Sequence, residues 1–166
     1  MGKLAVVQDD SVQGTDKHNV AGNATNPAPP PPPTVPYVGV GSYVYKGKMT
    51  DGLSSFVTFG GKPVALVTSK SSLNPGETAP TGGHGGPSGK DLTPDPLPYR
   101  IDKPSLSITD TIGTGVPNAA AGSALLTIGG VKVLLDGDKI DTCDGLSIPA
   151  NSTVTASGQS LVKCSA

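Results

Sequence analysis

The sequence predicts an all-β protein built from three β-hairpin repeats joined by long Gly- and Pro-rich loops. Three observations lead to this prediction. The chain of 166 residues contains 23 Gly and 17 Pro, a content that a loop-rich β protein uses in its turns. Its apolar residues occur in brief runs broken by Gly, which is typical of short strands. Nearly the same run occurs at residues 53–70 and 122–139, with a weaker copy at 152–164, and such repeats are a fold signature.

Each repeat consists of a strand, a pair of small residues and a second strand. The two clear copies align on Gly60-Gly61 and Gly129-Gly130, and the third copy has Ser157-Gly158 at this place. A two-residue, glycine-rich turn matches the twist of the flanking strands, so each copy is predicted to be a β-hairpin. A single hairpin is marginally stable in water. We therefore expect the three hairpins to shield one small core, in a single domain that covers residues 1–166.

Two proline-rich segments, residues 26–36 and 93–104, separate the repeats. Proline fixes φ and donates no hydrogen bond, so the run from Pro29 to Pro33 is expected to be extended polyproline II. Such a run can be a ligand for a proline-binding domain. We favour the simpler interpretation, in which both segments are stiff crossovers on the surface.

Charge and hydropathy exclude several classes of function. The formal net charge is −1, which gives no electrostatic footprint for nucleic acid or an anionic membrane. The apolar run from Leu4 to Val7 is too short for the core of a signal peptide. No stretch approaches the ~18 apolar residues of a membrane span. We therefore expect a protein that is made in the cytoplasm and does not use the general secretory route.

The chain contains two histidines and two cysteines, and together they are candidate zinc ligands: His18, His84, Cys143 and Cys164. Two neutral imidazoles and two thiolates form a suitable tetrahedral set for one closed, structural zinc site. Their spacing is not that of a zinc finger, although His84 lies in a glycine-rich stretch that lets the backbone approach a ligand. In the alternative interpretation, the cysteines are small buried hydrophobes or pair with each other, and the histidines are exposed loop residues.

Motifs for catalysis are lacking. The sequence has no G-x-S-x-G elbow, and its glycine runs are neither a P-loop nor a dinucleotide fingerprint. Adjacent acids, such as Asp9-Asp10, are more often turn caps than acid/base pairs. We therefore expect that the protein is not an enzyme.

The second repeat resembles the PAAR-repeat family. The matching residues are Gly122-Ser123, then the apolar run to Gly129-Gly130, Gly137-Asp138 and Cys143. His84-Gly85-Gly86 is similar to the family's His-Gly-Gly element. Pro63-Val64-Ala65-Leu66 stands where the family has its Pro-Ala-Ala-Arg tetrapeptide, and no copy of that tetrapeptide is intact here.

The resemblance implies a small, conical, β-prism-like domain that caps the needle of a contractile injection machine. Such machines include type VI secretion systems, phage-like tails and extracellular injection particles. The family's cone sits on a homotrimeric, VgrG-like β-helical spike protein and holds a zinc ion near its apex with His and Cys ligands. The implied function is therefore that of a spike tip, present once per trimer, which touches a target membrane only during piercing. Cargo would be a separate chain.

A second class of function stays open, that of a β-sandwich binding module or a tail adhesin that recognises a surface ligand such as carbohydrate. Modules of this kind usually display exposed aromatic side chains, and only 4% of this chain is aromatic. The composition therefore favours the spike tip over the adhesin.

Overall fold

Strands are the main regular elements of the described part of the molecule. The computed structural model describes residues 2–26, 33–73, 91–101, 105–110 and 112–164. Within them lie the strands β1 (Lys3–Leu4), β2 (Ser11–Thr25), β3 (Thr34–Asp51), β4 (Thr58–Phe59), β5 (Lys62–Pro63), β6 (Lys70–Leu73), β7 (Arg100–Ile101), β8 (Ser107–Ile108), β9 (Thr114–Pro117), β10 (Thr127–Ile128), β11 (Val131–Lys132), β12 (Lys139–Asp141), β13 (Ser152–Thr155) and β14 (Lys163–Cys164). The prediction of an all-β protein is confirmed. A helix with the length and apolarity needed to cross a bilayer does not occur in this part of the chain.

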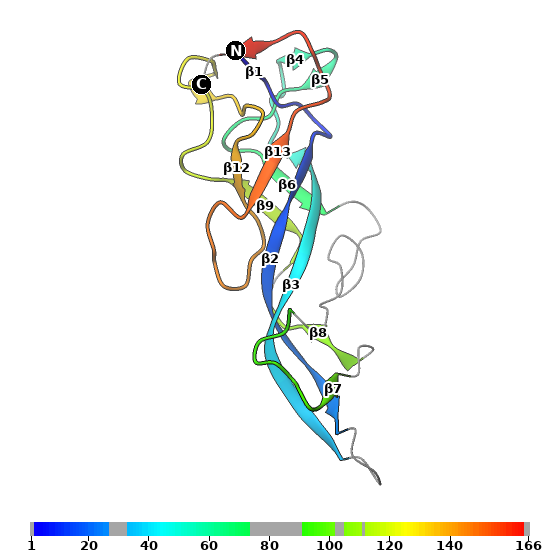
Figure 1. Cartoon of the computed structure of the whole chain (residues 1–166). Coiled ribbons are helices and arrows are strands. Elements are labelled where there is room, and N and C mark those ends of the chain that lie inside the picture. The colour runs from blue at the N-terminus through cyan, green and yellow to red at the C-terminus, as the bar shows by residue number, and fades with distance from the viewer. Residues whose placement is uncertain (1, 27–32, 74–90, 102–104, 111, 165–166) are drawn as a thin grey trace.

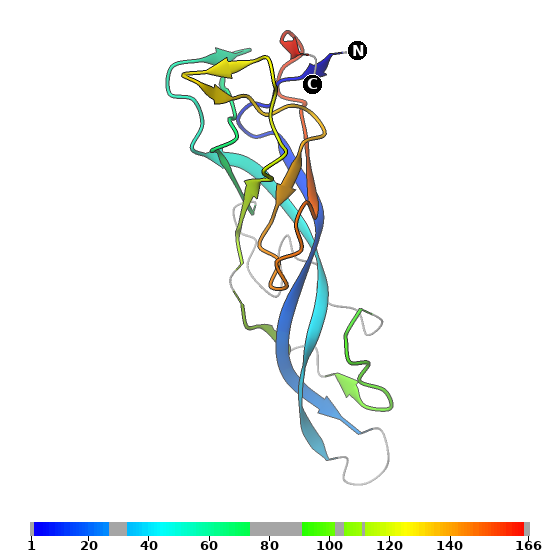
Figure 2. The same ribbon diagram turned by 90° about the vertical axis from the view of Figure 1, so that its left-hand side faces the viewer.

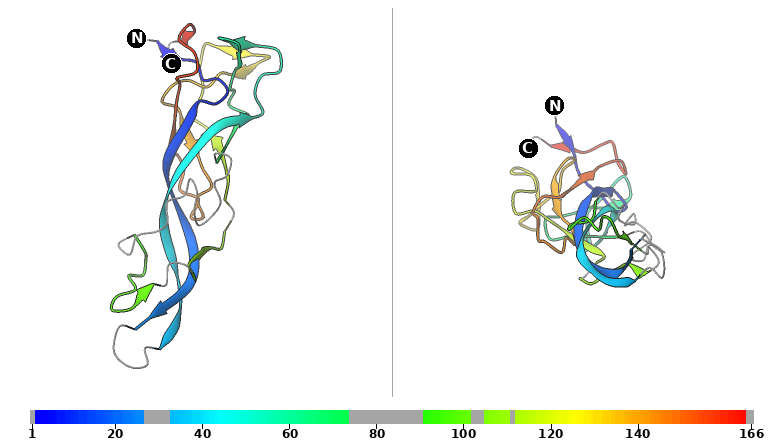
Figure 3. Two further views of the ribbon diagram at one scale, coloured as in Figure 1. Left: turned by 90° about the vertical axis from the view of Figure 1, so that its right-hand side faces the viewer. Right: turned by 60° about the horizontal axis from the view of Figure 1, so that its bottom comes forward.

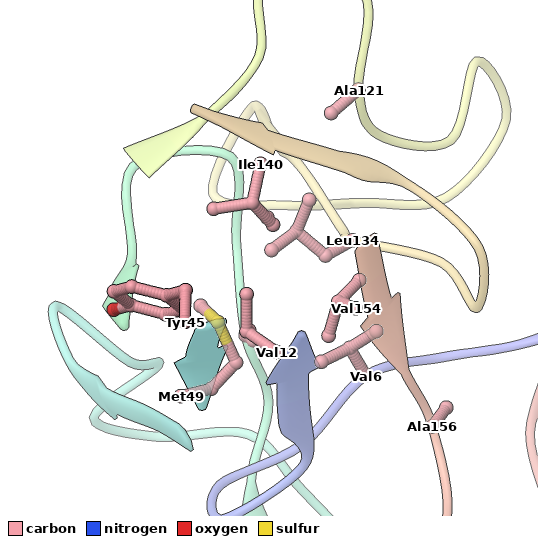
Figure 4. Close-up of a cluster of buried hydrophobic side chains, with 10 residues drawn as sticks. Val6, Val12, Tyr45, Met49, Ala121, Leu134, Ile140, Val154 and Ala156 are labelled. Atoms are coloured by element: carbon pink, nitrogen blue, oxygen red, sulfur yellow. The ribbon is translucent and has the colours of Figure 1, made fainter. Parts of the chain in front are cut away.

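Six strands close into a small antiparallel barrel. The pairing runs from β2 through β13, β12, β9, β6 and β3 and returns to β2. Side chains that alternate along these strands fill the interior, as the period of two in a strand requires. The buried cluster contains Val12, Tyr45, Met49, Ile140 and Val154 (Figure 4). Tyr45 keeps its hydroxyl satisfied inside this core through a 2.9 Å hydrogen bond with the Ser71 hydroxyl.

The strands β2 and β3 continue beyond the barrel as a long two-stranded arm (Figure 1). They pair without interruption from Ser11 opposite Lys48 to Thr25 opposite Thr34. Figure 3 shows the ribbon twisting along its length, as isolated two-stranded ribbons do. The strands β7 and β8 pair with β2 on the arm, over a second core of Val20, Ala24, Tyr37, Tyr43, Leu92 and Leu106.

The two glycine-pair turns predicted from the sequence are present. Strand β4 pairs with β5 across Gly60-Gly61, and β10 pairs with β11 across Gly129-Gly130. All four glycines have φ between 58° and 81°. A turn with positive φ at both central residues joins antiparallel strands with the correct twist, and glycine adopts it without steric cost.

The third predicted hairpin is wrong in its position. Ser157-Gly158 is not a hairpin turn, because β13 pairs with β12 and β2, not with β14. Strand β14 instead pairs with β1, so that Cys164 lies opposite Lys3. The third unit is therefore not a true hairpin, because it pairs two strands, β1 and β14, that lie far apart in the sequence. We call the three structures unit A (residues 54–69), unit B (123–138) and unit C (159–164 with 3–10).

The three units share one pattern of hydrogen bonds. The Val57 N–H bonds to the Ser54 hydroxyl, the Leu126 N–H to the Ser123 hydroxyl, and the Val162 N–H to the Gln159 side-chain oxygen. Their central residues Val6, Ala65 and Leu134 form a closed ring of backbone bonds. Val6 donates to Leu134, Leu134 to Ala65, and Ala65 to Val6, at 2.9–3.0 Å. The units are thus arranged with an internal, approximate threefold symmetry at one end of the molecule (Figure 2).

The proline-rich segment 26–36 is not a crossover between hairpins. Its flanking residues Thr25 and Thr34 lie directly opposite each other, and the Asn26 N–H bonds to the Pro33 carbonyl. The segment therefore connects β2 to β3 at the far end of the arm. Residues 27–32 lie outside the described residues, so the predicted polyproline conformation is not tested. Of the second segment, residues 93–101 run beside the arm, where Thr93 bridges to Val40 and Arg100–Ile101 forms β7, and residues 102–104 lie outside the described residues.

Candidate metal centre

Three potential metal ligands meet in the interior where the barrel passes into the arm. Asp16 and His18 lie two residues apart on β2 and therefore face the same side of the sheet. Both side chains are fully buried. Cys143 follows β12, in the loop that leads to β13, and is half-buried. One ligand atom from each of these residues lies within 4.8 Å of the others.

The ligand atoms point toward one another. The Cys143 thiol donates to Asp16 Oδ2 at 3.3 Å, and the same oxygen lies 3.8 Å from His18 Nε2. The other carboxylate oxygen, Asp16 Oδ1, accepts from the Thr142 hydroxyl and from Asn151 Nδ2. Asp16 therefore directs one oxygen into the cluster and has the other held by neighbouring residues.

The second nitrogen of the His18 ring bonds to a carboxylate on the opposite side. His18 Nδ1 lies 2.5 Å from Asp110 Oδ1, and Asp110 Oδ2 accepts from the backbone N–H of Asn19 at 2.8 Å. Partial burial favours neutral Asp110, but the bonds from Asn19 and His18 outweigh it and hold the pKa of this carboxyl below its usual range.

The surroundings of the His18 imidazole favour its protonated form when no metal is bound. Burial alone would lower its pKa, because desolvation disfavours the charged ring. Hydrogen bonds with Asp16, Cys143 and Asp110 outweigh this effect and raise the pKa of His18 from 6.5 to about 10. A metal ion must therefore replace the proton on Nε2 and the proton of the Cys143 thiol.

Solvent reaches the cluster from the side of Cys143. A cavity of about 380 Å³ opens there, and its walls include Asp110, Asp141, Cys143 and Asp144. Three carboxylates at the mouth favour the entry of a cation over that of an anion.

The chemistry of this donor set fits a metal ion. Imidazole nitrogen, thiolate and carboxylate are the ligand types that proteins offer to zinc and related transition metals. One dication would balance the charges of Asp16 and a Cys143 thiolate, which burial otherwise makes costly. The cluster can thus hold a metal ion.

The structure brings together two of the four predicted ligands. His18 and Cys143 lie in the cluster, whereas Cys164 lies in β14 and its sulfur is 3.2 Å from the Ser123 hydroxyl. The predicted His84 lies outside the described residues. The two cysteines do not form a disulfide with each other, which excludes the alternative in which they pair. His18 is not an exposed loop residue either.

Asp16 is the ligand that the sequence did not indicate. It is one of 13 acidic residues, and nothing in its local sequence distinguishes it. Its spacing of two from His18 is informative only once β2 is known to be a strand, because alternate residues of a strand share a face.

We expect Gly145→Ala to weaken metal binding although Gly145 supplies no ligand. A Cβ at this position would overlap the Asp110 carboxylate, so Asp110 must move away from His18. Loss of a group that orients a metal-bound histidine typically costs about 10–100-fold in affinity. Competition with a zinc-sensitive chelating dye measures the effect. Leu125→Ala is a control, since Leu125 is 74% exposed and lies in unit B, outside the cluster. Equal losses in both variants would contradict a specific role for Asp110.

Comparisons with known proteins gave no relative to which this chain could be assigned: no family model matches it, and no curated protein or solved structure does.

Proposed function

We propose that this protein is the spike tip of a contractile injection machine and caps the end of a homotrimeric, VgrG-like needle. The observation that supports this proposal is the ring formed by units A, B and C. A homotrimer presents three identical surfaces around one axis, and a single chain can engage all three only if it offers three similar surfaces itself. Three hairpins whose backbones bond in a closed ring meet this requirement.

Each unit also exposes one large apolar side chain at the same position. These residues are Phe56, Leu125 and Leu161, and they are 74%, 74% and 78% exposed. In each unit, the backbone N–H of the next residue (Val57, Leu126 or Val162) bonds to the side chain of the unit's first residue. The three exposed side chains therefore occupy equivalent positions in the shared hydrogen-bond pattern. Apolar side chains in matching positions are typical of an interface. We infer that they contact the three subunits of the spike.

The long arm extends away from the hairpin units (Figure 1). With the units seated on the trimer, the arm would lead toward the target and would touch its membrane only during piercing. Cargo would be carried as a separate chain. The proposal includes synthesis in the cytoplasm, assembly at the spike apex and delivery with the particle, with no nucleic-acid partner and no enzymatic activity.

We further propose that the ion bound by Asp16, His18 and Cys143 is zinc, one per chain. Thiolate ligation favours zinc over magnesium and calcium, and a redox-silent ion suits a part with a mechanical task. When bound, zinc supplies charge balance and fixed geometry to this interior. The residues of the chain hold and orient the ligand atoms.

The alternative function, a carbohydrate-binding module or tail adhesin, has less support. Sugar-binding surfaces usually offer aromatic rings to the ligand, and here Tyr37, Tyr43 and Tyr45 are buried, so that Phe56 is the large exposed aromatic side chain of the described residues. Glycan binding in the absence of binding to any trimeric spike would favour this alternative.

A binding experiment with matched variants tests the spike-tip proposal. The full chain is mixed with the trimeric spike protein of the same organism, and the mass of the complex is measured by light scattering. We expect one chain per trimer. Replacing Phe56, Leu125 and Leu161 together by Asp should weaken binding by about a hundredfold or more, because burying one such side chain contributes about 1.5–3 kcal/mol.

Leu97→Asp is the matched control for these variants, since Leu97 is 75% exposed but lies beside the arm. We expect it to bind like the wild type. A stable homotrimer of this chain alone, or a complex with three chains per spike, would contradict the symmetry argument.

A further inference from the structure

The metal centre lies at the junction between the barrel and the arm. Along β2, residues 11–14 pair with β13 in the barrel, and residues 20–21 pair with β8 on the arm. Asp16 and His18 lie between these two stretches. The third ligand, Cys143, comes from the loop between β12 and β13, and the orienting Asp110 follows β8. Barrel and arm thus each contribute to the same cluster.

The cluster also touches both hydrophobic cores. Cys143 packs against the barrel core that contains Val12 and Ile140. On the other side, the His18 ring meets the ring of Tyr43 edge to face, with centroids 5.6 Å apart. Tyr43 belongs to the arm core with Val20 and Leu106. These are separate clusters of buried side chains, and the metal ligands lie between them.

Hydrogen bonds of backbone N–H groups next to the metal ligands also join the segments that meet at the junction. The Lys17 N–H donates to Asp144 Oδ2, and the Gly145 N–H donates to the Lys17 carbonyl, at 2.8 and 2.7 Å. They hold the loop that carries Cys143 against β2. The Asn19 N–H bonds to Asp110, and the Thr109 N–H to the Asn19 carbonyl, which ties the segment after β8 to the same strand.

We propose that metal binding by Asp16, His18 and Cys143 fixes the arm to the barrel, with Asp110 as the residue that positions His18. Binding joins three chain segments, so its free energy stabilises their packing at the junction. It adds nothing to the ring of Val6, Ala65 and Leu134, which lies among the hairpin units. Loss of the metal therefore loosens the junction and leaves the hairpin units folded. This inference rests on the proposed metal centre and does not depend on docking to a trimer.

Amide hydrogen exchange of the full chain, with Zn²⁺ and after removal of metal by a chelator, tests the inference. With Zn²⁺ at about 100 times its Kd, local opening at the site should be about 100-fold rarer than without it. When the metal is removed, we expect the protection factors to fall about 100-fold at four amides, those of Lys17, Asn19, Thr109 and Gly145. The amides of Val6, Ala65 and Leu134 should keep their protection.

Variants separate ligation from general stability. Cys143→Ser and Asp16→Asn should abolish the protection that Zn²⁺ adds, while Cys164→Ser should retain it, because Cys164 lies outside the cluster. Equal loss of protection at the junction and in the hairpin ring would overturn the inference. Loss of the Zn²⁺ effect in Cys164→Ser would overturn the ligand set. A wild-type chain that takes up no Zn²⁺ would overturn the metal centre as well, while leaving the spike-tip proposal to its own binding test.

Discussion

Leu134→Ala should destabilise the protein by about 3–5 kcal/mol, the range seen for buried leucines whose surroundings cannot collapse. Leu134 is fully buried and packs between the barrel core and the hairpin units. Its backbone is fixed by bonds to Val6 and Ala65, so the neighbouring units cannot move inward to fill the cavity. Urea denaturation followed by far-UV circular dichroism measures the change in the free energy of unfolding.

Leu125→Ala is the matched control for this prediction. Leu125 lies in the same unit but is 74% exposed, and surface substitutions of this kind usually change stability by less than about 0.5 kcal/mol. Similar losses in the two variants would mean that the ring of units A, B and C is not the centre of the fold.

Asp10→Ala should cost about 3 kcal/mol or more, an unusually large effect for an acidic residue. The buried Asp10 carboxylate accepts bonds from the N–H groups of Val7, Ser157 and Gly158, at 2.7–2.9 Å. It thereby fastens residues 157–158 to residues 7–10 of unit C. Alanine leaves one buried and two part-buried backbone donors without this acceptor, and a buried unsatisfied donor costs about 1–3 kcal/mol. Thermal unfolding in matched buffers measures the loss.

The neighbouring residue provides the control. Asp9 has its side chain half-exposed, 3.8 Å from the ammonium group of Lys62, and its φ is 67°. Asn tolerates this left-handed conformation, and exposed ion pairs contribute little, so Asp9→Asn should change stability by less than about 1 kcal/mol. A cost for Asp9→Asn as large as that for Asp10→Ala would contradict the role assigned to the buried carboxylate.

The fold was predictable from the sequence where one local pattern determines it. Gly60-Gly61 and Gly129-Gly130 need positive φ and lie between apolar runs, so turn and strands could be inferred together. Unit C could not be found in this way, because its two strands are far apart in the sequence and no turn joins them. The similarity of residues 152–164 to the other repeats is real, but those residues belong partly to β13 in the barrel wall.

The sequence did not predict the long arm of β2 and β3, and the reason differs from that for unit C. The inward positions of β2 beyond the barrel include Asp16 and His18, so the strand lacks the apolar alternation by which strands are recognised. Strand β3 does have this apolar alternation, since Tyr43, Tyr45 and Met49 alternate with exposed residues. Glycines at positions 39, 41 and 47 interrupt that pattern and favour an interpretation as loop.

For the metal centre, residue type predicted more than spacing. Histidine and cysteine are rare in this chain, so His18 and Cys143 could be named as ligands without any structure. Their meeting with Asp16 depends on the register of β2 against its neighbours and on the loop after β12, which are both tertiary properties. Cys164 was included only because of its residue type, and its place in β14 separates it from the cluster.

Unit C cannot form until residues 159–164 have left the ribosome, because they pair with residues 3–10, which are made first. The bond between the Gln159 side chain and the Ala5 carbonyl spans 154 positions of the sequence. At about 5–20 residues per second, the apolar run at residues 4–7 waits on the order of 10 s for its partner strand. The hydrogen-bonded ring of Val6, Ala65 and Leu134 also needs Leu134 in place, so a nascent chain that stops before this residue keeps its core open. Translation must therefore pass residue 164 before the three units and their shared core are complete.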